Sequence, residues 1–168
     1  MQKIFISACL LGQKVTYDGR SNFLDNAIVA QWKEDGRIVP ACPEVLGGLP
    51  TPRPAAYIVG RDGGAGVLDK TACVLKKDGG DVTAPFVEGA TRALEIVRKH
   101  DIKIAIMKER SPSCGSREIY AGDFSGQKIP GSGVAAALLK RNGVTVFSEN
   151  EIDRADLFLK ELERKAVA

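Results

Sequence analysis

The chain has 168 residues, a hydrophobic content of 44% and a formal net charge of +3 at pH 7. These values predict a single globular domain, residues 1–168, whose core is large enough to need no disulfide framework. The charges are scattered, and the sequence shows neither a secretory leader nor an 18-residue apolar stretch. We therefore expect no large nucleic-acid partner, no membrane partner and a cytoplasmic location.

The first third of the chain alternates between strand and helix periodicity. A strand is predicted over residues 3–8, and a helix capped by Asn22 follows it. A second strand, residues 37–42, contains Pro40, which cannot donate to a sheet ladder, so we expect this strand at an edge. Four of the eight prolines lie within residues 42–54. They predict a stiff loop that positions side chains.

The remainder of the chain continues the alternation. Strand-like segments broken by glycine-rich turns predict a β-hairpin over residues 57–81. Four further elements are expected: a helix from Thr83, a strand over 102–107, a helix over 133–141 and a strand over 144–147. A capping box of Ser148 and Glu151 predicts a final helix over about residues 150–165. The pattern indicates an α/β fold, a Rossmann-like domain with a mainly parallel sheet flanked by helices, plus the hairpin.

The cysteines occupy distinctive positions in this predicted fold. In a reducing compartment, four cysteines favour metal binding, catalysis or packing over disulfides. Cys9, Cys42 and Cys114 each lie at or after the end of a predicted strand, and parallel strands end at one edge of a sheet, so the three are expected to converge. Cys73 lies inside the hairpin and is expected to fill the core. His100, the single histidine, is expected at a helix end without a catalytic role.

Three thiols without histidine suit a soft metal centre. The candidates are a zinc ion completed by a carboxylate or water and an iron-sulfur cluster. Three protein ligands on a four-iron cube would leave one iron open as a Lewis acid for a soft atom such as sulfur. Each cysteine taken alone is also explained as a small buried side chain.

Polar residues near the cysteines indicate an active site. Glu44 lies two positions after the second cysteine and is the expected acid or base. Ser111 and Ser113 precede the third cysteine, where a hydroxyl can bind substrate or relay a proton. Asp18 and Arg53 could orient a polar heterocycle or bind an anion, although a turn-forming aspartate and a surface arginine explain them equally well.

Several long motifs occur in a characteristic order between residues 3 and 149. They include SACLLG, YDGRSN, CPEVLGGLPTPRP, KERSPSCGSREIYAGDFSG and GSGVAAALLKRNGVTVFSE. With these motifs the chain resembles the thiouracil desulfidase family, long known only as a domain of unknown function. The resemblance covers nearly the whole chain.

The resemblance implies an enzyme with a [4Fe-4S] cluster held by Cys9, Cys42 and Cys114. It implies catalytic roles for Glu44 and Ser111. The expected reaction is a hydrolytic, non-redox cleavage of the carbon-sulfur bond of 2- or 4-thiouracil, as base or nucleoside, with water supplying oxygen and sulfide leaving. The expected partner is thus a small thiolated pyrimidine. A non-catalytic sensing module ordered by a metal or cluster and a zinc-dependent hydrolase are the alternatives.

Two features depart from the family pattern. Val15 and Thr16 stand where many members carry Cys-Arg before the YDG motif, so an additional thiol and an arginine contact to substrate are absent. The hairpin over residues 60–80 varies within the family. It could therefore tune the choice of substrate.

Overall fold

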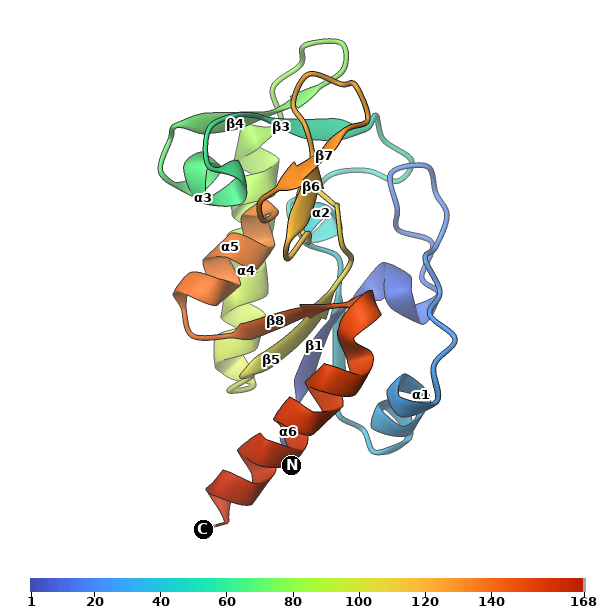
Figure 1. Cartoon of the computed structure of the whole chain (residues 1–168). Helices are drawn as coiled ribbons and strands as arrows, with labels where there is room; N and C mark the ends of the chain where they lie inside the picture. Colours follow the sequence, from blue (N-terminus) through green and yellow to red (C-terminus); the bar gives the residue numbers. More distant parts are fainter. Residues whose placement is uncertain (168) are drawn as a thin grey trace.

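A four-stranded parallel sheet lies at the centre of the computed structural model, which describes residues 1–167 (Figure 1). Its strands, in the spatial order β2-β1-β5-β8, are β2 (Ile38–Ala41), β1 (Ile4–Ser7), β5 (Ile104–Met107) and β8 (Thr145–Ser148). All three neighbouring pairs are parallel. Every residue of β1 and β5 is buried, which explains their unbroken apolar sequences. The predicted α/β fold with a mainly parallel sheet is confirmed.

Helices cover both faces of the sheet. They are α1 (Ala27–Glu34), α4 (Thr83–Lys99), α5 (Val134–Arg141) and α6 (Ile152–Ala166). Because side chains alternate along a strand, Phe5 and Met107 pack with α4 and α5 on one face, whereas Ile6 and Ile106 pack with α1 and α6 on the other. No helix within residues 1–167 combines the length and the apolar character that crossing a membrane requires.

The position of β2 agrees with its sequence. This strand forms an edge of the sheet, as its proline predicts. Pro40 pairs in register with Ile6 and is exposed, so its missing N–H leaves no unsatisfied donor in the sheet interior.

The helix starts match the sequence-based predictions in part. Asn22 is not the cap of α1, and that prediction is wrong: the helix begins four residues later than expected, with the side chain of Asn26 accepting hydrogen bonds from the amides of Ile28 and Val29. The capping box of Ser148 and Glu151 is confirmed, and it leads into α6 through a short 3₁₀ turn.

Short elements occupy several of the connections between the strands and long helices. They are the 3₁₀ turns η1 (Ala8–Leu11) and η2 (Glu149–Glu151) and the short helices α2 (Pro43–Leu46) and α3 (Gly63–Leu68). The prediction of an unbroken loop after Cys42 was thus wrong, because Pro43 occupies the first turn of α2, where its missing N–H has no cost.

Two antiparallel hairpins extend beyond the sheet (Figure 1). The predicted hairpin is confirmed in β3 (Ala56–Gly60) and β4 (Ala72–Lys76), although α3 rather than a turn joins its strands. A second hairpin, β6 (Glu118–Tyr120) and β7 (Lys128–Pro130), lies between the strand predicted over 102–107 and the helix predicted over 133–141, where no element was predicted.

Candidate active site

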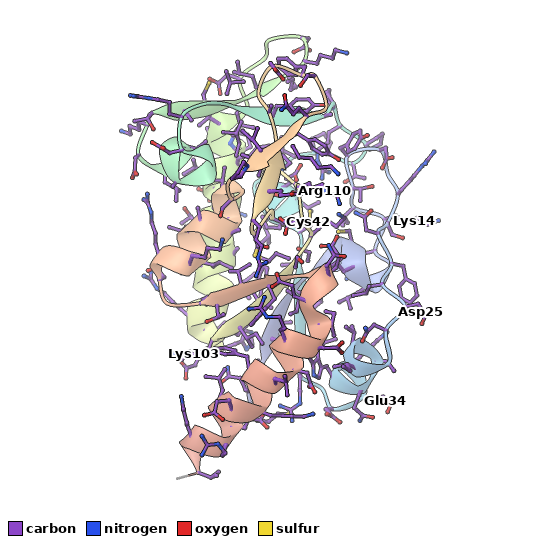
Figure 2. The ribbon with its side chains drawn as sticks, in the orientation of Figure 1. Lys14, Asp25, Glu34, Cys42, Lys103 and Arg110 are labelled. Carbon is purple, nitrogen blue, oxygen red and sulfur yellow. The ribbon has the colours of Figure 1, made fainter. Side chains whose placement is uncertain are left out.

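The three strand-end cysteines line one cavity. Cys9 lies in η1 directly after β1, Cys42 separates β2 from α2, and Cys114 follows β5. The cavity has a volume of about 690 Å³ and lies beyond the carboxyl ends of these strands. Figure 2 marks Cys42 and Arg110, two of its lining residues, between the sheet and the β6–β7 hairpin. The convergence expected from parallel topology is therefore observed.

Burial determines whether these thiols are protonated when no metal is bound. It raises the pKa of Cys9 and of Cys42, and it raises the pKa of Cys114 to about 12. In their charged forms, Cys42 and Cys9 would act in the same direction on the pKa of Cys114. Protonated thiols are poor nucleophiles, but a bound metal cation deprotonates them. The environment therefore suits metal ligands better than nucleophiles.

A chain of polar side chains connects two of the cysteine-bearing loops. The Ser113 hydroxyl donates to Glu44 Oε2 at 2.8 Å and lies 2.9 Å from Ser111 Oγ and 3.5 Å from Cys114 Sγ. Glu44 Oε1 accepts a hydrogen bond from Arg53 Nε at 3.0 Å. A hydroxyl has a single proton, so Ser113 can donate to only one of these neighbours at a time. Rotation of its O–H would therefore redirect a proton along the chain.

Arg53 lies behind Glu44 and is buried, with 8% of its surface exposed. Besides Glu44, its guanidinium donates to the carbonyls of Pro50 and Val15 and to the hydroxyl of Thr51, at 2.8–3.1 Å. These contacts engage all three nitrogens of the side chain. They hold the carboxylate in place, and contact between Arg53 and substrate stays a prediction.

Asp18 lies at the rim of the cavity. Its carboxylate accepts hydrogen bonds from Thr16 Oγ1 at 2.5 Å and from the Arg20 amide at 3.3 Å. The Thr16 hydroxyl is the main cause of the lowered pKa of Asp18. Asp18 and Thr16 thus stabilise a turn, and a contact between Asp18 and substrate stays a prediction.

The cavity wall includes side chains that sequence analysis did not assign to the site. They are Asn22, Tyr57, Lys108, Arg110 and Tyr120, among others. The amide of Asn22, the wrongly predicted helix cap, donates to the Cys9 carbonyl at 3.0 Å, and the side chain of Asn22 acts against burial, which raises the pKa of the Cys9 thiol. Lys108 and Arg110 lie three residues and one residue before Ser111 in the KERSPSCG motif, so their position in the sequence could have indicated that they belong to the site. The tyrosines come from the two hairpins and gave no such signal.

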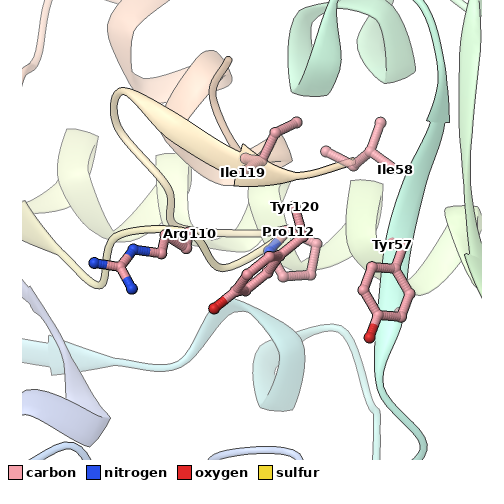
Figure 3. Close-up of a pocket in the computed structure, with 7 residues that line it drawn as sticks. Tyr57, Ile58, Arg110, Pro112, Ile119 and Tyr120 are labelled. Carbon is pink, nitrogen blue, oxygen red and sulfur yellow. The ribbon is translucent and has the colours of Figure 1, made fainter. Parts of the chain in front are cut away.

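Arg110 differs from the other cations of the cavity wall. Lys108 pairs with Glu149 at 2.7 Å, and Arg53 is fully engaged, whereas Arg110 Nε is buried without a hydrogen-bond partner within residues 1–167. The backbone of Arg110 is left-handed, with φ of 70°, which is uncommon for a residue other than glycine. Figure 3 shows its guanidinium extending away from Tyr57, beside a second cavity of about 10 Å³.

Close backbone packing fixes the loops that carry these groups. Gly133, at the start of α5, lies against the peptide between Ser113 and Cys114, and a Cβ added there would lie 2.4 Å from the Ser113 carbonyl carbon. The first amides of α5 donate to carbonyls of the same loop, for example Ala136 N to Ser113 O at 3.1 Å. A second close contact joins α4 to α2. A Cβ added at Gly89 of α4 would lie 1.9 Å from Pro43 O, so the contact with α2 requires glycine at position 89.

A site for a single metal ion finds no support in this geometry. Within residues 1–167, no three His, Cys, Asp or Glu side chains form a group that could hold a metal ion. The zinc alternative requires such a group, because thiolates bind zinc at about 2.3 Å.

A parallel α/β sheet that presents three thiols, two of them on buried residues, together with a carboxylate and two hydroxyls around one cavity defines an enzyme with a cysteine-lined active site. The chain matches the family described as 2-thiouracil desulfurase over residues 4–151 and belongs to that family. The resemblance read from the sequence motifs is thereby confirmed.

Two similar proteins extend this comparison. The chain is 44% identical over 150 residues to YbbK, an uncharacterized protein of Bacillus subtilis (strain 168), a match that covers 89% of this chain and 97% of YbbK. It also resembles the solved structure of the [4Fe-4S]-dependent thiouracil desulfidase TudS, with a TM-score of 0.87 and 44% identity. That likeness covers 95% of this chain and 99% of the TudS chain.

Proposed function

We propose that this protein is a [4Fe-4S]-dependent thiouracil desulfidase that replaces the sulfur of a thiolated uracil with oxygen from water. The arrangement of three cysteines, Glu44 and Ser113 around one cavity carries the proposal. Family membership and the likeness to TudS support it. The reaction converts C=S and water into C=O and hydrogen sulfide, so it needs proton transfer but no net electron transfer. We further propose a small-molecule substrate and a cytoplasmic location.

The residues present fit such a cluster. Three free thiols line the cavity, and they come from three separate loops. In a four-iron cluster each cysteine thiolate binds a different iron, so three thiols on separate loops can hold three of the four irons. Cys9, Cys42 and Cys114 would hold it. When bound, the cluster would supply an iron without a cysteine ligand, a Lewis acid suited to the sulfur of the substrate.

Glu44 is the proposed general base. Its carboxylate lies at the cavity wall, with one oxygen held by Arg53 and the other in contact with Ser113. In this role it removes a proton from the water that adds to the ring carbon of the substrate. Glu44 then returns this proton to the departing sulfur, and the second proton of the added water follows as the C=O bond forms and the C–S bond breaks, so both protons leave with hydrogen sulfide.

Ser111 and Ser113 share the second polar role. Ser111 Oγ accepts hydrogen bonds from the amides of Ser113 and Cys114, both at 3.2 Å, which fixes its position. Ser113 touches Glu44 directly, so we assign the proton relay to Ser113 and the orientation of the heterocycle to Ser111. The geometry thus favours Ser113 for a role that the family resemblance gave to Ser111.

The decisive experiment is anaerobic reconstitution followed by measurement of sulfide release from 2- and 4-thiouracil. We expect iron and acid-labile sulfide near four per chain, as a cube of this type requires, and turnover of at least one substrate. Glu44→Gln should retain the iron and lose turnover. An intact cluster without turnover of any thiolated pyrimidine would favour the sensing module, and zinc without iron would favour the hydrolase.

A further inference from the structure

Glu109 is a buried carboxylate that the proposed mechanism does not use. It is 7% exposed and lies at the start of the loop that follows β5. Its Oε1 accepts hydrogen bonds from the amides of Ser116, Arg117 and Glu118 at 2.8, 3.0 and 3.1 Å. Its Oε2 accepts a hydrogen bond from the Ser116 hydroxyl at 3.0 Å. The amide of Arg110 also donates to Oε1, at 3.4 Å, so five donors converge on one side chain.

These donors, rather than a cation, compensate the charge. Within residues 1–167, no lysine or arginine side chain forms an ion pair with the Glu109 carboxylate; the neighbouring Lys108, Arg110 and Arg117 pair with Glu149, Glu118 and Glu151 instead. Burial acts to raise the pKa of Glu109, but the hydrogen bonds from Arg117, Glu118 and Ser116 outweigh it and lower the pKa. A buried charge is tolerated only when its hydrogen bonds are made, so the three amides are held firmly in place.

The carboxylate closes the loop that carries the reactive groups. Glu109 lies at the start of the loop, and its hydrogen-bond donors, residues 116–118, lie at the end of the loop. Ser113 and Cys114 therefore lie between these two ends. The backbone adds one further link across the same ends, from Arg110 N to Glu118 O at 3.1 Å.

A second network fixes the start of the loop to the body of the protein. The amide of Glu109 donates to Glu149 Oε1 at 2.8 Å, and Glu149 Oε2 pairs with Lys108 Nζ at 2.7 Å. Glu149 belongs to η2, at the start of α6. The loop is therefore anchored to η2 at its start and to the Glu109 carboxylate at its end.

We propose that Glu109 is a positioning residue whose buried carboxylate holds Cys114 in place as a cluster ligand and holds Ser113 against Glu44. The part of this inference that concerns turnover rests on the proposed function. The part that concerns the position of Cys114 is independent of the proposed function, because the hydrogen bonds that fix the loop join residues of the chain alone.

The test compares Glu109→Ala and Glu109→Gln with the parent protein in three measurements. The first is the rate at which each cysteine of the metal-free full chain is alkylated by iodoacetamide, resolved by peptide mass spectrometry. We expect Glu109→Ala to raise the rate at Cys114 at least tenfold and the rates at Cys9 and Cys42 less than twofold. Glu109→Gln keeps one acceptor oxygen and should show a smaller increase, also confined to Cys114.

The second and third measurements use the reconstituted enzyme. Loss of visible cluster absorbance to an iron chelator should be at least tenfold faster in Glu109→Ala, and kcat should fall about tenfold with a smaller change in KM. A matched control is Asp156→Asn on α6, which removes a carboxylate partner of Trp32 on the face of the sheet opposite Cys114. This control should lower the melting temperature without changing cluster release or thiol selectivity.

Two results would overturn the inference. One is an equal increase in alkylation of all three cysteines, which would indicate a general loss of structure. The other is unchanged rates in both variants. If Glu109→Ala does not fold, the alkylation rates of Glu109→Gln and Ser116→Ala replace it, since each of these variants removes part of the hydrogen bonding around the Glu109 carboxylate. Failure of the parent enzyme to release sulfide from thiouracil, with Cys114 still exposed selectively, would reject the proposed function and leave the positioning role standing.

Discussion

The ion pair between Arg53 and Glu44 yields the most exacting prediction. The two side chains are 4% and 14% exposed and are joined at 3.0 Å, so both charges are largely removed from water. Removing one partner of a buried pair leaves an uncompensated charge and costs about 3–5 kcal/mol. Arg53→Met, which keeps the length of the side chain without its charge, should therefore lower the free energy of unfolding of the metal-free protein by that amount.

A double-mutant cycle isolates the pair from the other contacts of Arg53. Glu44→Gln alone leaves the guanidinium uncompensated, whereas Arg53→Met with Glu44→Gln leaves no unpaired charge. We expect the double variant to be more stable than the sum of the single effects by at least about 2 kcal/mol, within the range found for contacting residues. Urea unfolding monitored by circular dichroism measures all four proteins. Additivity within about 0.5 kcal/mol would refute the view that Arg53 compensates Glu44.

Three further predictions concern the walls of the site and its thiols. Gly89→Ala places a Cβ against Pro43 O and should lower both the melting temperature and sulfide release, whereas Ala90→Gly on the same helix should lower the melting temperature alone. Arg110→Gln should raise KM for thiouracil at least fivefold while leaving iron content unchanged, because its guanidinium lines the cavity and Nε has no hydrogen-bond partner within residues 1–167, its ion pair with Glu118 Oε2 being long at 3.8 Å. An unchanged KM in steady-state assays would remove Arg110 from the substrate site. Since the folded-state pKa of Cys114 is raised from 9.0 to about 12, its contribution to stability is complete below pH 9 and is lost as pH rises towards 12. Unfolding of the metal-free protein between pH 8 and 11 should show this loss, and Cys114→Ala should reduce it.

Sequence patterns predicted the features that depend on topology. Once the strands before Cys9, Cys42 and Cys114 are read as parallel, their carboxyl ends must meet at one edge, and the three thiols meet with them. The edge position of β2 followed in the same way from Pro40.

Features that depend on tertiary contacts were not predictable in the same way. Asn22 and Asn26 are both good helix caps, and local sequence does not show which of them the packed helix uses. The strands of the second hairpin have three residues each, too few for alternation to be visible. The hydrogen bond from Arg53 to the carbonyl of Val15, 38 positions earlier in the chain, is likewise invisible to any local pattern.

The two hairpins supply a part of the cavity that is structurally separate from the cysteines. Tyr57 and Tyr120 belong to different hairpins, which contact one another through Tyr57 and Phe124, with ring centroids 4.8 Å apart. The thiols, by contrast, follow strands of the central sheet. Insertions or exchanges in the hairpins away from residues 116–118, which bind Glu109, can therefore reshape the opposing wall while the loop that carries Cys114 keeps its contacts, so this scaffold is modular. New substrate preferences could evolve, or be engineered, while the cysteines and the proposed catalytic residues stay unchanged.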